Sequence, residues 1–480
     1  MQQTLLVTLL ERGEELFHQA VQRAWPLDAE AAFGALPTPL RLHADPRFTG
    51  RGVTIAIADS GFAAHPDLIQ PDNRVRAWVD ASRAPVTARV FEPEEHPAWP
   101  DSMAERNHQW HGTMTSVVAA GNGFASRGLY RGIASEATVI LLHLTDSDGR
   151  ITDQSILRAL AWIEANAERF GIRVVSLSVA GDAPVDAMLG PIEQAVERLV
   201  AAGITILAAA GNDGERRLVP PATAPSVITV GGLDDRNVLD HQSARLWHSN
   251  FGDSATGTPK PELVAPSLWV VAPVLPGSAV AREATTLFAR RGDAAHERRI
   301  GELKLVTPDY QHVDGTSFAA PIAAATVAAM LEANSRLTPR LLRELLIRSA
   351  QPVPGAPPER QGAGALDAGR AVALAVLERH GWDGPSPVTP IVTTAGAVFQ
   401  VHDHAAMQVA VFGSWDDWAQ AVPGRGQEAG VWRTDPVALA PGEYQYKLKI
   451  DDRLWLTDPT NPWRVPDGLG GINSRLRWLP

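Results

Sequence analysis

The chain contains no cysteine, so no disulfide bond stabilises it. It also lacks an uninterrupted run of about 18 apolar residues, which predicts that no segment crosses a bilayer. The first ten residues lack the basic region of a secretory signal, and charged side chains follow them directly. These absences predict a cytoplasmic protein with no membrane partner.

The net charge of -11 over 480 residues is too small to indicate a general nucleic-acid binder. Hydrophobic residues make up 45% and charged residues 20% of the chain, as in ordinary globular proteins. The length is sufficient for two or three domains of about 100–200 residues each. We therefore expect a globular protein of several domains that does not bind nucleic acid.

The hydrophobic pattern divides the chain into four parts. Residues 1–40 form an N-terminal segment, helical and then extended, for which a short propeptide is one interpretation. Residues 41–378 form the main domain, and residues 379–396 form a linker rich in proline and glycine. Residues 397–480 form a second, smaller domain.

In the main domain, short apolar runs alternate with helical patterns. This alternation predicts an α/β fold, in which helices flank a parallel sheet and functional groups gather at the carboxyl ends of the strands. The predicted strands cover residues 53–58, 138–144, 174–179, 204–209 and 227–230, and the predicted helices cover residues 153–170 and 191–202.

The last part of the chain alternates with period two. From Tyr444 to Ile450, apolar and aromatic side chains face one side, and Gln445, Lys447 and Lys449 face the other. This pattern predicts an all-β, immunoglobulin-like sandwich over residues 397–480.

Four short motifs in the main domain carry reactive or polar side chains. Asp59 ends the first predicted strand, His111 precedes an apolar helical run, Asn212 follows another strand, and Ser317 opens a helix of small residues. Singly, each motif is more typical of a turn, a helix cap or a strand end than of a catalytic site. Their occurrence together on one predicted scaffold favours catalysis.

These residue types belong together chemically. A serine hydroxyl is a poor nucleophile until an imidazole takes its proton, and the imidazole needs a carboxylate to fix its tautomer and orientation. An asparagine amide can donate to a developing oxyanion. A helix N-terminus adds backbone N–H groups and a favourable dipole at the nucleophile.

The order Asp, His, Ser and the motif Gly-Thr-Ser-Phe-Ala-Ala-Pro around the serine resemble the subtilisin-like (subtilase) family. The resemblance implies a subtilisin-like fold and a serine endopeptidase that acts on proteins or peptides. It implies that Asp59 orients His111, that His111 is general base and acid, that Ser317 attacks, and that Asn212 donates to the oxyanion.

The same resemblance implies a substrate-binding site. Its expected members, which pair with the substrate backbone or line the pocket, are Ser178, Val179, Ala180, Gly181 and Gly211. The family usually has glycine at the position of Ala180, so the added methyl is expected to narrow the pocket for the residue before the scissile bond. The long, charged stretch of residues 275–313 is similar to an insertion.

No cofactor is expected to be required. Members of the family often bind calcium, and Asp146, Asp148 and Asp153 could supply carboxylates, but a plain turn fits this loop better. No metal ligand is therefore assigned. Before the main domain, the prolines of Leu36–Leu40 predict an extended strand that either blocks the cleft or serves as a simple linker.

The C-terminal part resembles the glycogen-binding module of AMP-activated kinase beta subunits and of isoamylase-type enzymes. The resemblance implies that Trp418, Lys447, Trp455 and Asn473 contact an α-glucan. This is chemically reasonable, since sugar rings present apolar C–H faces to flat aromatic surfaces while Lys and Asn bond the hydroxyls. The alternative is a module that only supports its neighbour.

Three functions follow from these patterns. The first is an active endopeptidase targeted to glycogen or another α-glucan. The second is a catalytically silent glucan-binding scaffold, against which the complete set of catalytic residue types argues. The third is an active protease whose C-terminal module is only structural.

Overall fold

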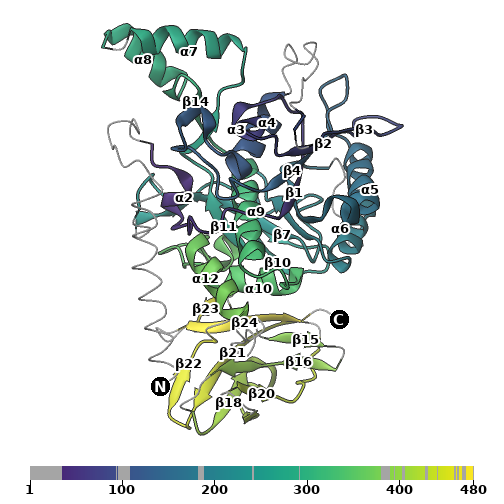
Figure 1. The fold of residues 1–480 in the computed structure, drawn as a ribbon. Coiled ribbons are helices and arrows are strands. Elements are labelled where there is room, and N and C mark those ends of the chain that lie inside the picture. Colours follow the sequence, from purple (N-terminus) through teal and green to yellow (C-terminus); the bar gives the residue numbers. More distant parts are fainter. Residues whose placement is uncertain are drawn as a thin grey trace.

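The computed structural model describes residues 35–92, 94–95, 109–181, 189–239, 243–290, 292–379, 390–393, 395–402, 406–426, 431–440, 442–458, 461, 464–467 and 472–478. Figure 1 shows a layered α/β body with a helical hairpin at its top and an all-β part below it.

A nine-stranded sheet organises the described part of the main domain. Its strands run in the order β11 (Leu263–Pro266), β7 (Ile228–Asp234), β6 (Thr205–Ala209), β5 (Ile172–Leu177), β1 (Thr54–Asp59), β4 (Thr138–His143), β2 (Val75–Asp80) and β3 (Thr87–Val90), and β8 (Arg245–Leu246) pairs with β7. All neighbours from β11 to β2 are parallel, whereas β3 and β8 pair antiparallel. The predicted parallel sheet is therefore confirmed.

The helices of the main domain that the structure describes are α2 (Thr38–Arg41), α3 (Pro66–Ile69), α4 (Gln109–Ala120), α5 (Asp153–Phe170), α6 (Pro191–Ala201), α7 (Ala279–Ala289), α8 (Ala294–Glu302), α9 (Thr316–Ala333), α10 (Pro339–Ser349), α11 (Pro358–Gln361) and α12 (Ala368–Arg379). The predicted helices over residues 153–170 and 191–202 correspond to α5 and α6. The five predicted strands correspond to β1, β4, β5, β6 and β7.

Side chains of the sheet enter two cores, one on each face. Alternate residues of β1 show the division, because Ile55 and Ile57 pack with α4 and α9, and Ala56 and Ala58 pack with α5 and α6. Every residue of β1 is buried. This explains why the strands read as continuous apolar runs without alternation.

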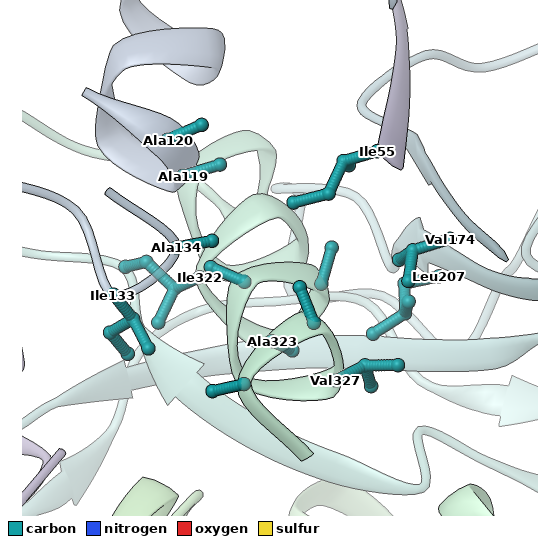
Figure 2. Close-up of a cluster of buried hydrophobic side chains, with 14 of the residues drawn as sticks. Ile55, Ala119, Ala120, Ile133, Ala134, Val174, Leu207, Ile322, Ala323 and Val327 are labelled. Carbon is teal, nitrogen blue, oxygen red and sulfur yellow. The ribbon is translucent and has the colours of Figure 1, made fainter. Parts of the chain in front are cut away.

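Helix α9 lies against the middle of the sheet, and most of its own side chains are small and buried (Figure 2). Ala323 faces this core with no exposed surface, near Val174 and Leu207 of the sheet. Among the described residues, α9 is also the one helix long and apolar enough by composition to cross a bilayer. Because 89% of that stretch is buried inside the protein, the helix is part of the core.

The end of the N-terminal segment differs from the predicted extended strand. Thr38–Arg41 forms the short helix α2, Leu42 is fully buried in the main core, and Ala35 packs beside Tyr130 and Tyr310. The Leu42 carbonyl accepts a hydrogen bond from Ala368 N at 3.0 Å. Proline at the first turn explains the helix, since its fixed φ suits that position. Residues 1–34 lie outside the described residues.

The insertion expected at residues 275–313 forms a separate unit. It contains the helical hairpin α7–α8 and the strands β13 (Leu305–Thr307) and β14 (Tyr310–Val313). These two strands join β12 (Val270–Pro273), which precedes the stretch, in an antiparallel sheet of order β12, β14, β13. A small apolar cluster that includes Ala284 and Leu287 holds the hairpin to this sheet. Strands β9 (Gly252–Asp253) and β10 (Pro259–Lys260) form a further two-stranded ribbon.

The C-terminal part is an all-β unit. Strands β15 (Ile391–Thr393) and β16 (Gly396–Val398) pair, so the first strand lies inside the stretch predicted as a linker. The larger sheet follows the order β17 (Gln400–His402), β20 (Val431–Thr434), β19 (Val422–Gly426), β18 (Val409–Gly413), β21 (Gly442–Ile450), β24 (Ile472–Trp478) and β23 (Arg464–Pro466), with β22 (Leu454–Leu456) paired to β21. The immunoglobulin-like sandwich stays a prediction.

The predicted alternation in β21 agrees with the burial of its side chains. Tyr446, Leu448 and Ile450 are buried in the core of the C-terminal unit, and Lys447 and Lys449 are not. The period of two therefore identified the core face of this strand correctly.

We expect Ala323→Leu to lower the free energy of unfolding by about 1–3 kcal/mol, because added methylene groups have no space between α9 and the sheet. Ala161→Leu, at an exposed position of α5, is the matched control and should change stability little. Denaturant unfolding of both variants measures the difference. Equal stability of the two variants would show that the core around α9 tolerates larger side chains.

Candidate active site

A carboxylate and an imidazole meet at the carboxyl end of β1. Asp59 is the last residue of this strand and is fully buried, and His111 lies in the first turn of α4. His111 Nδ1 and Asp59 Oδ1 are 2.6 Å apart. The structure thus brings together two of the residues that the sequence singled out, in the geometry that fixes an imidazole tautomer.

Two further groups donate hydrogen bonds to the buried carboxylate of Asp59. Thr115 Oγ1 donates to Asp59 Oδ2 at 2.9 Å, and the backbone N–H of Ser60 donates to Asp59 Oδ1 at 2.6 Å. Sequence reasoning missed Thr115, although its position one helical turn after His111 is a usable signal. Hydrogen bonds to both oxygens fix the orientation of this carboxylate.

Two opposing effects act on the pKa of His111. Burial alone would lower this pKa, because it disfavours the charged imidazolium, but the charge of Asp59 and its hydrogen bond favour that form. The attraction prevails, so the pKa of His111 is raised above the ordinary value of 6.5. The imidazole side chain is 22% exposed, so solvent and substrate can reach it.

Ser317 lies at the start of α9, next to this pair. Gly315 precedes the helix with a φ of 130°, a conformation that favours glycine. Ser178 Oγ donates to the Ser317 carbonyl at 2.8 Å, which ties the helix start to the end of β5. The ring of Phe318 lies 5.8 Å from the ring of His111, centroid to centroid. The helix start and the imidazole are therefore neighbours.

Thr316 orients the amide of Asn212. Asn212 Oδ1 accepts hydrogen bonds from Thr316 N at 3.0 Å and from Thr316 Oγ1 at 2.8 Å. The amide nitrogen is left to face the space beside Gly315, where a Cβ would lie 3.5 Å from Asn212 Nδ2 and 3.8 Å from Ser317 N. The Asn212 amide nitrogen and the Ser317 backbone N–H therefore lie near the same side of Gly315. Sequence reasoning also missed the role of Thr316.

Hydrogen bonds with Thr316 and Asn250 fix the loop that carries Asn212. Gly211 has a φ of 102°, and a Cβ there would lie 2.6 Å from Asn250 Nδ2. Gly211 N donates to Thr316 Oγ1 at 3.1 Å. Asn250 Oδ1 accepts from the backbone N–H groups of Asp213 and Glu215 at 2.8 and 3.2 Å. Gly211 therefore has a structural reason to be glycine, besides its expected place in the substrate site.

The expected substrate strand follows β5. Ser178 and Val179 are buried, Ala180 is exposed, and Gly181 N donates to the Pro220 carbonyl at 2.8 Å. A Cβ at Gly181 would lie 2.5 Å from Asp153 Oδ1, so a larger residue there would require the Asp153 side chain to move. The methyl of Ala180 is accessible on this strand, where the resemblance placed a pocket wall.

The loop considered for calcium forms a turn. Asp146 Oδ1 accepts from the backbone N–H groups of Asp148 and Arg150, both at 2.9 Å. An aspartate that bonds its own backbone two residues on is typical of such turns. Within the residues that the structure describes, no group of three or more His, Asp or Glu side chains is arranged to hold a metal ion.

Three of the four expected glucan-binding residues share one face of the C-terminal sheet. In the register, Lys447 pairs with Phe412, Lys449 pairs with Trp455, and Gln445 pairs with Arg475, two positions after Asn473. Side chains of directly paired residues point to the same side, so Lys447, Trp455 and Asn473 do as well. Trp418 is half-buried in the turn after β18, and its backbone N–H donates to the Gly413 carbonyl at 2.9 Å.

These residues differ in how available they are. Trp455 is 45% exposed and lies 5.0 Å from the ring of Phe412, with Lys449 Nζ 5.5 Å from its centroid. Lys447 Nζ instead pairs with Asp467 at 2.8 Å, and the buried Asn473 donates to Gln445 Oε1 at 2.7 Å. The sequence pattern had placed Lys449 on the same face as Lys447, whereas it missed Phe412 as a member of this face.

The main domain of the chain matches a known protein family. Residues 50–364 match the profile of the subtilase family. The serine protease AprX of Bacillus subtilis (strain 168) is 30% identical over 332 residues, which are 68% of this chain and 67% of AprX. Subtilisin BL of Lederbergia lenta is 29% identical over 189 residues, which are 39% of this chain and 58% of that protein.

A solved structure, Sphericase, is 22% identical and covers 63% of this chain and 84% of its own, with a TM-score of 0.47. The family match spans both strands and helices of the main domain and contains Asp59, His111, Asn212 and Ser317. The chain belongs to the subtilase family of serine proteases.

Proposed function

We propose that this protein is a serine endopeptidase whose triad is Asp59, His111 and Ser317. The observation that carries the proposal is the 2.6 Å contact between Asp59 Oδ1 and His111 Nδ1, with Phe318 of the nucleophile helix packed beside the imidazole. With Nδ1 bonded to the carboxylate, the other ring nitrogen, Nε2, is left to accept a proton. That arrangement makes a serine hydroxyl nucleophilic.

The reaction then proceeds in two halves. Ser317 Oγ attacks the peptide carbonyl while His111 Nε2 takes the hydroxyl proton, and the amide of Asn212 with the N–H of Ser317 donates to the oxyanion. His111 returns the proton to the leaving amine as the C–N bond breaks. Water, deprotonated by the same imidazole, hydrolyses the acyl-enzyme and restores Ser317.

A fluorophosphonate probe and peptide cleavage test this proposal together. We expect Ser317→Ala to abolish both labelling and cleavage, since the corresponding loss in subtilisin is about 10⁶ in kcat. Asn212→Ala should lower kcat by about 10²–10³ with little change in KM, because its amide acts on the transition state. Ser278→Ala, which removes a hydroxyl from the hairpin helix α7, is the control and should behave as the unmodified protein. Labelling that persists in Ser317→Ala would place the nucleophile elsewhere.

The raised pKa of His111 predicts the acid limit of activity. Only the neutral imidazole can accept the serine proton, so kcat/KM should fall as the pH drops through a pKa above 6.5. The pH dependence of kcat/KM reports this group in the free enzyme. His296→Gln, in helix α8, should leave the profile unchanged. An acid limit below pH 6.5 would mean that burial outweighs the attraction of Asp59.

For the C-terminal unit, we propose binding of an α-glucan such as glycogen. What supports this is the shared face of Lys447, Trp455 and Asn473, together with the exposure of the Trp455 ring. The partners that Lys447 and Asn473 already have would keep both side chains in place, so that a sugar hydroxyl meets groups of fixed geometry. Binding would concentrate the protease on glucan particles and the proteins attached to them.

The double variant Trp418→Ala and Trp455→Ala should abolish co-sedimentation with glycogen and spare peptide cleavage. Each aromatic platform contributes about 0.5–1.5 kcal/mol beyond its buried area, on the scale of aromatic pairs. The matched control is Leu454→Ala with Leu456→Ala, exposed neighbours on the other face of β22, which should keep binding. Failure of the unmodified protein to bind glycogen would leave the unit as a support for the protease.

A further inference from the structure

We infer that Arg41 is a positioning residue for Ser317, because it fixes the turn Ser267–Trp269 to which the backbone ahead of the nucleophile is bonded. The inference deepens the proposed function and rests on it. It also gives the N-terminal segment a role opposite to the blocking of the cleft, since α2 becomes part of the catalytic domain.

Arg41 is the last residue of α2, and its side chain has no exposed surface. Its Nε donates to Asp235 Oδ2 at 2.8 Å. Its Nη1 donates to the Trp269 carbonyl at 2.7 Å, and its Nη2 donates to the Leu268 carbonyl at 3.3 Å. A guanidinium is a rigid planar fork, so these three bonds hold one carboxylate and two consecutive carbonyls in fixed relative positions.

The turn that Arg41 binds is hydrogen-bonded to the backbone just before the nucleophile. Ser267 N donates to the Leu233 carbonyl at 2.8 Å, and the Ser267 carbonyl accepts from Gly315 N at 2.9 Å. Gly315 is the cap of α9 and stands two residues before Ser317. After the turn, Val270 pairs with Val313, so both the turn and its following strand fix the approach to Gly315.

The backbone of the turn needs such support. Trp269 has a φ of 59°, in the left-handed region that a residue with a bulky side chain rarely adopts. Its ring is 42% exposed and meets His312 edge-on at 5.4 Å, so its side chain is not deeply packed. Strained backbone persists only where surrounding contacts determine it. The two carbonyl bonds of Arg41 are among those contacts.

The expected effect falls on the chemical step. Arg41 acts on Gly315 through Leu268, Trp269 and Ser267, and these three hydrogen bonds of its side chain go to Asp235, Trp269 and Leu268. Loss of its bonds should let the start of α9 shift, and a misplacement of about 1 Å at a reacting group can cost about 10²-fold in rate. We therefore expect kcat to fall about 10- to 100-fold while KM changes little.

The test separates this role from stability. Arg41→Met alone leaves Asp235 buried and unpaired, so it is expected to unfold at a lower temperature. The double variant Arg41→Met with Asp235→Asn removes both charges and should recover most of the melting temperature, yet keep the lowered kcat and a slowed reaction with the fluorophosphonate probe. Asp235→Asn alone keeps the hydrogen bonds from Arg41 to both carbonyls and should retain kcat.

Arg173→Met is the matched control at the other end of the domain. Arg173 also donates to two carbonyls, those of Ser335 and Leu337, but these follow the far end of α9, whose last residue lies about 24 Å from Ser317 by the rise of the helix. The variant Arg173→Met should be less stable than the unmodified protein but have the same kcat. Unmodified kcat in the folded double variant would overturn the inference, whereas an unmodified protein that neither cleaves peptides nor reacts with the probe would overturn the proposed function itself.

Discussion

The close approach of helix α9 to the parallel sheet is the constraint on which the rest of the structure depends. Only small side chains allow this approach, and α9 carries them on nearly every side because sheet strands, α4 and α12 all surround it. The position of its first turn is therefore set by packing along its whole length. Ser317 belongs to that first turn, so the core determines where the candidate nucleophile stands.

The polar part of the site is built on a second requirement, that every buried charge be paired or hydrogen-bonded. Asp59 has no exposed surface and meets His111, Thr115 and its own following N–H. The same logic governs the pair of Arg41 and Asp235 at the end of β7. In both places a carboxylate at the carboxyl edge of the sheet orders side chains that come from distant segments.

Much of this was predictable because parallel strands buried on both faces leave a plain record in the sequence. The runs around Ile57, Leu141 and Leu207 could be assigned for that reason, and the capping box of Thr152 and Ser155 opens α5 at the predicted residue. Edge strands such as β3 are exposed and leave no such record. The motifs marked Asp59, His111, Asn212 and Ser317, and Thr115 could be found one helical turn after His111. Arg41, in contrast, depends on partners far away in the sequence. Such partners become visible only when the chain is folded.

The helical hairpin α7–α8 leaves and re-enters the domain through Pro273 and Tyr310, which are paired across β12 and β14. Tyr310 is itself anchored, since its hydroxyl donates to the buried Asp67 at 2.6 Å. Because both ends are held together, the entropic cost of closing the intervening chain into a loop depends only weakly on its length. The chain between Pro273 and Tyr310 could therefore be shortened or lengthened at little entropic cost, while the strand register that leads to Ser317 remains the same.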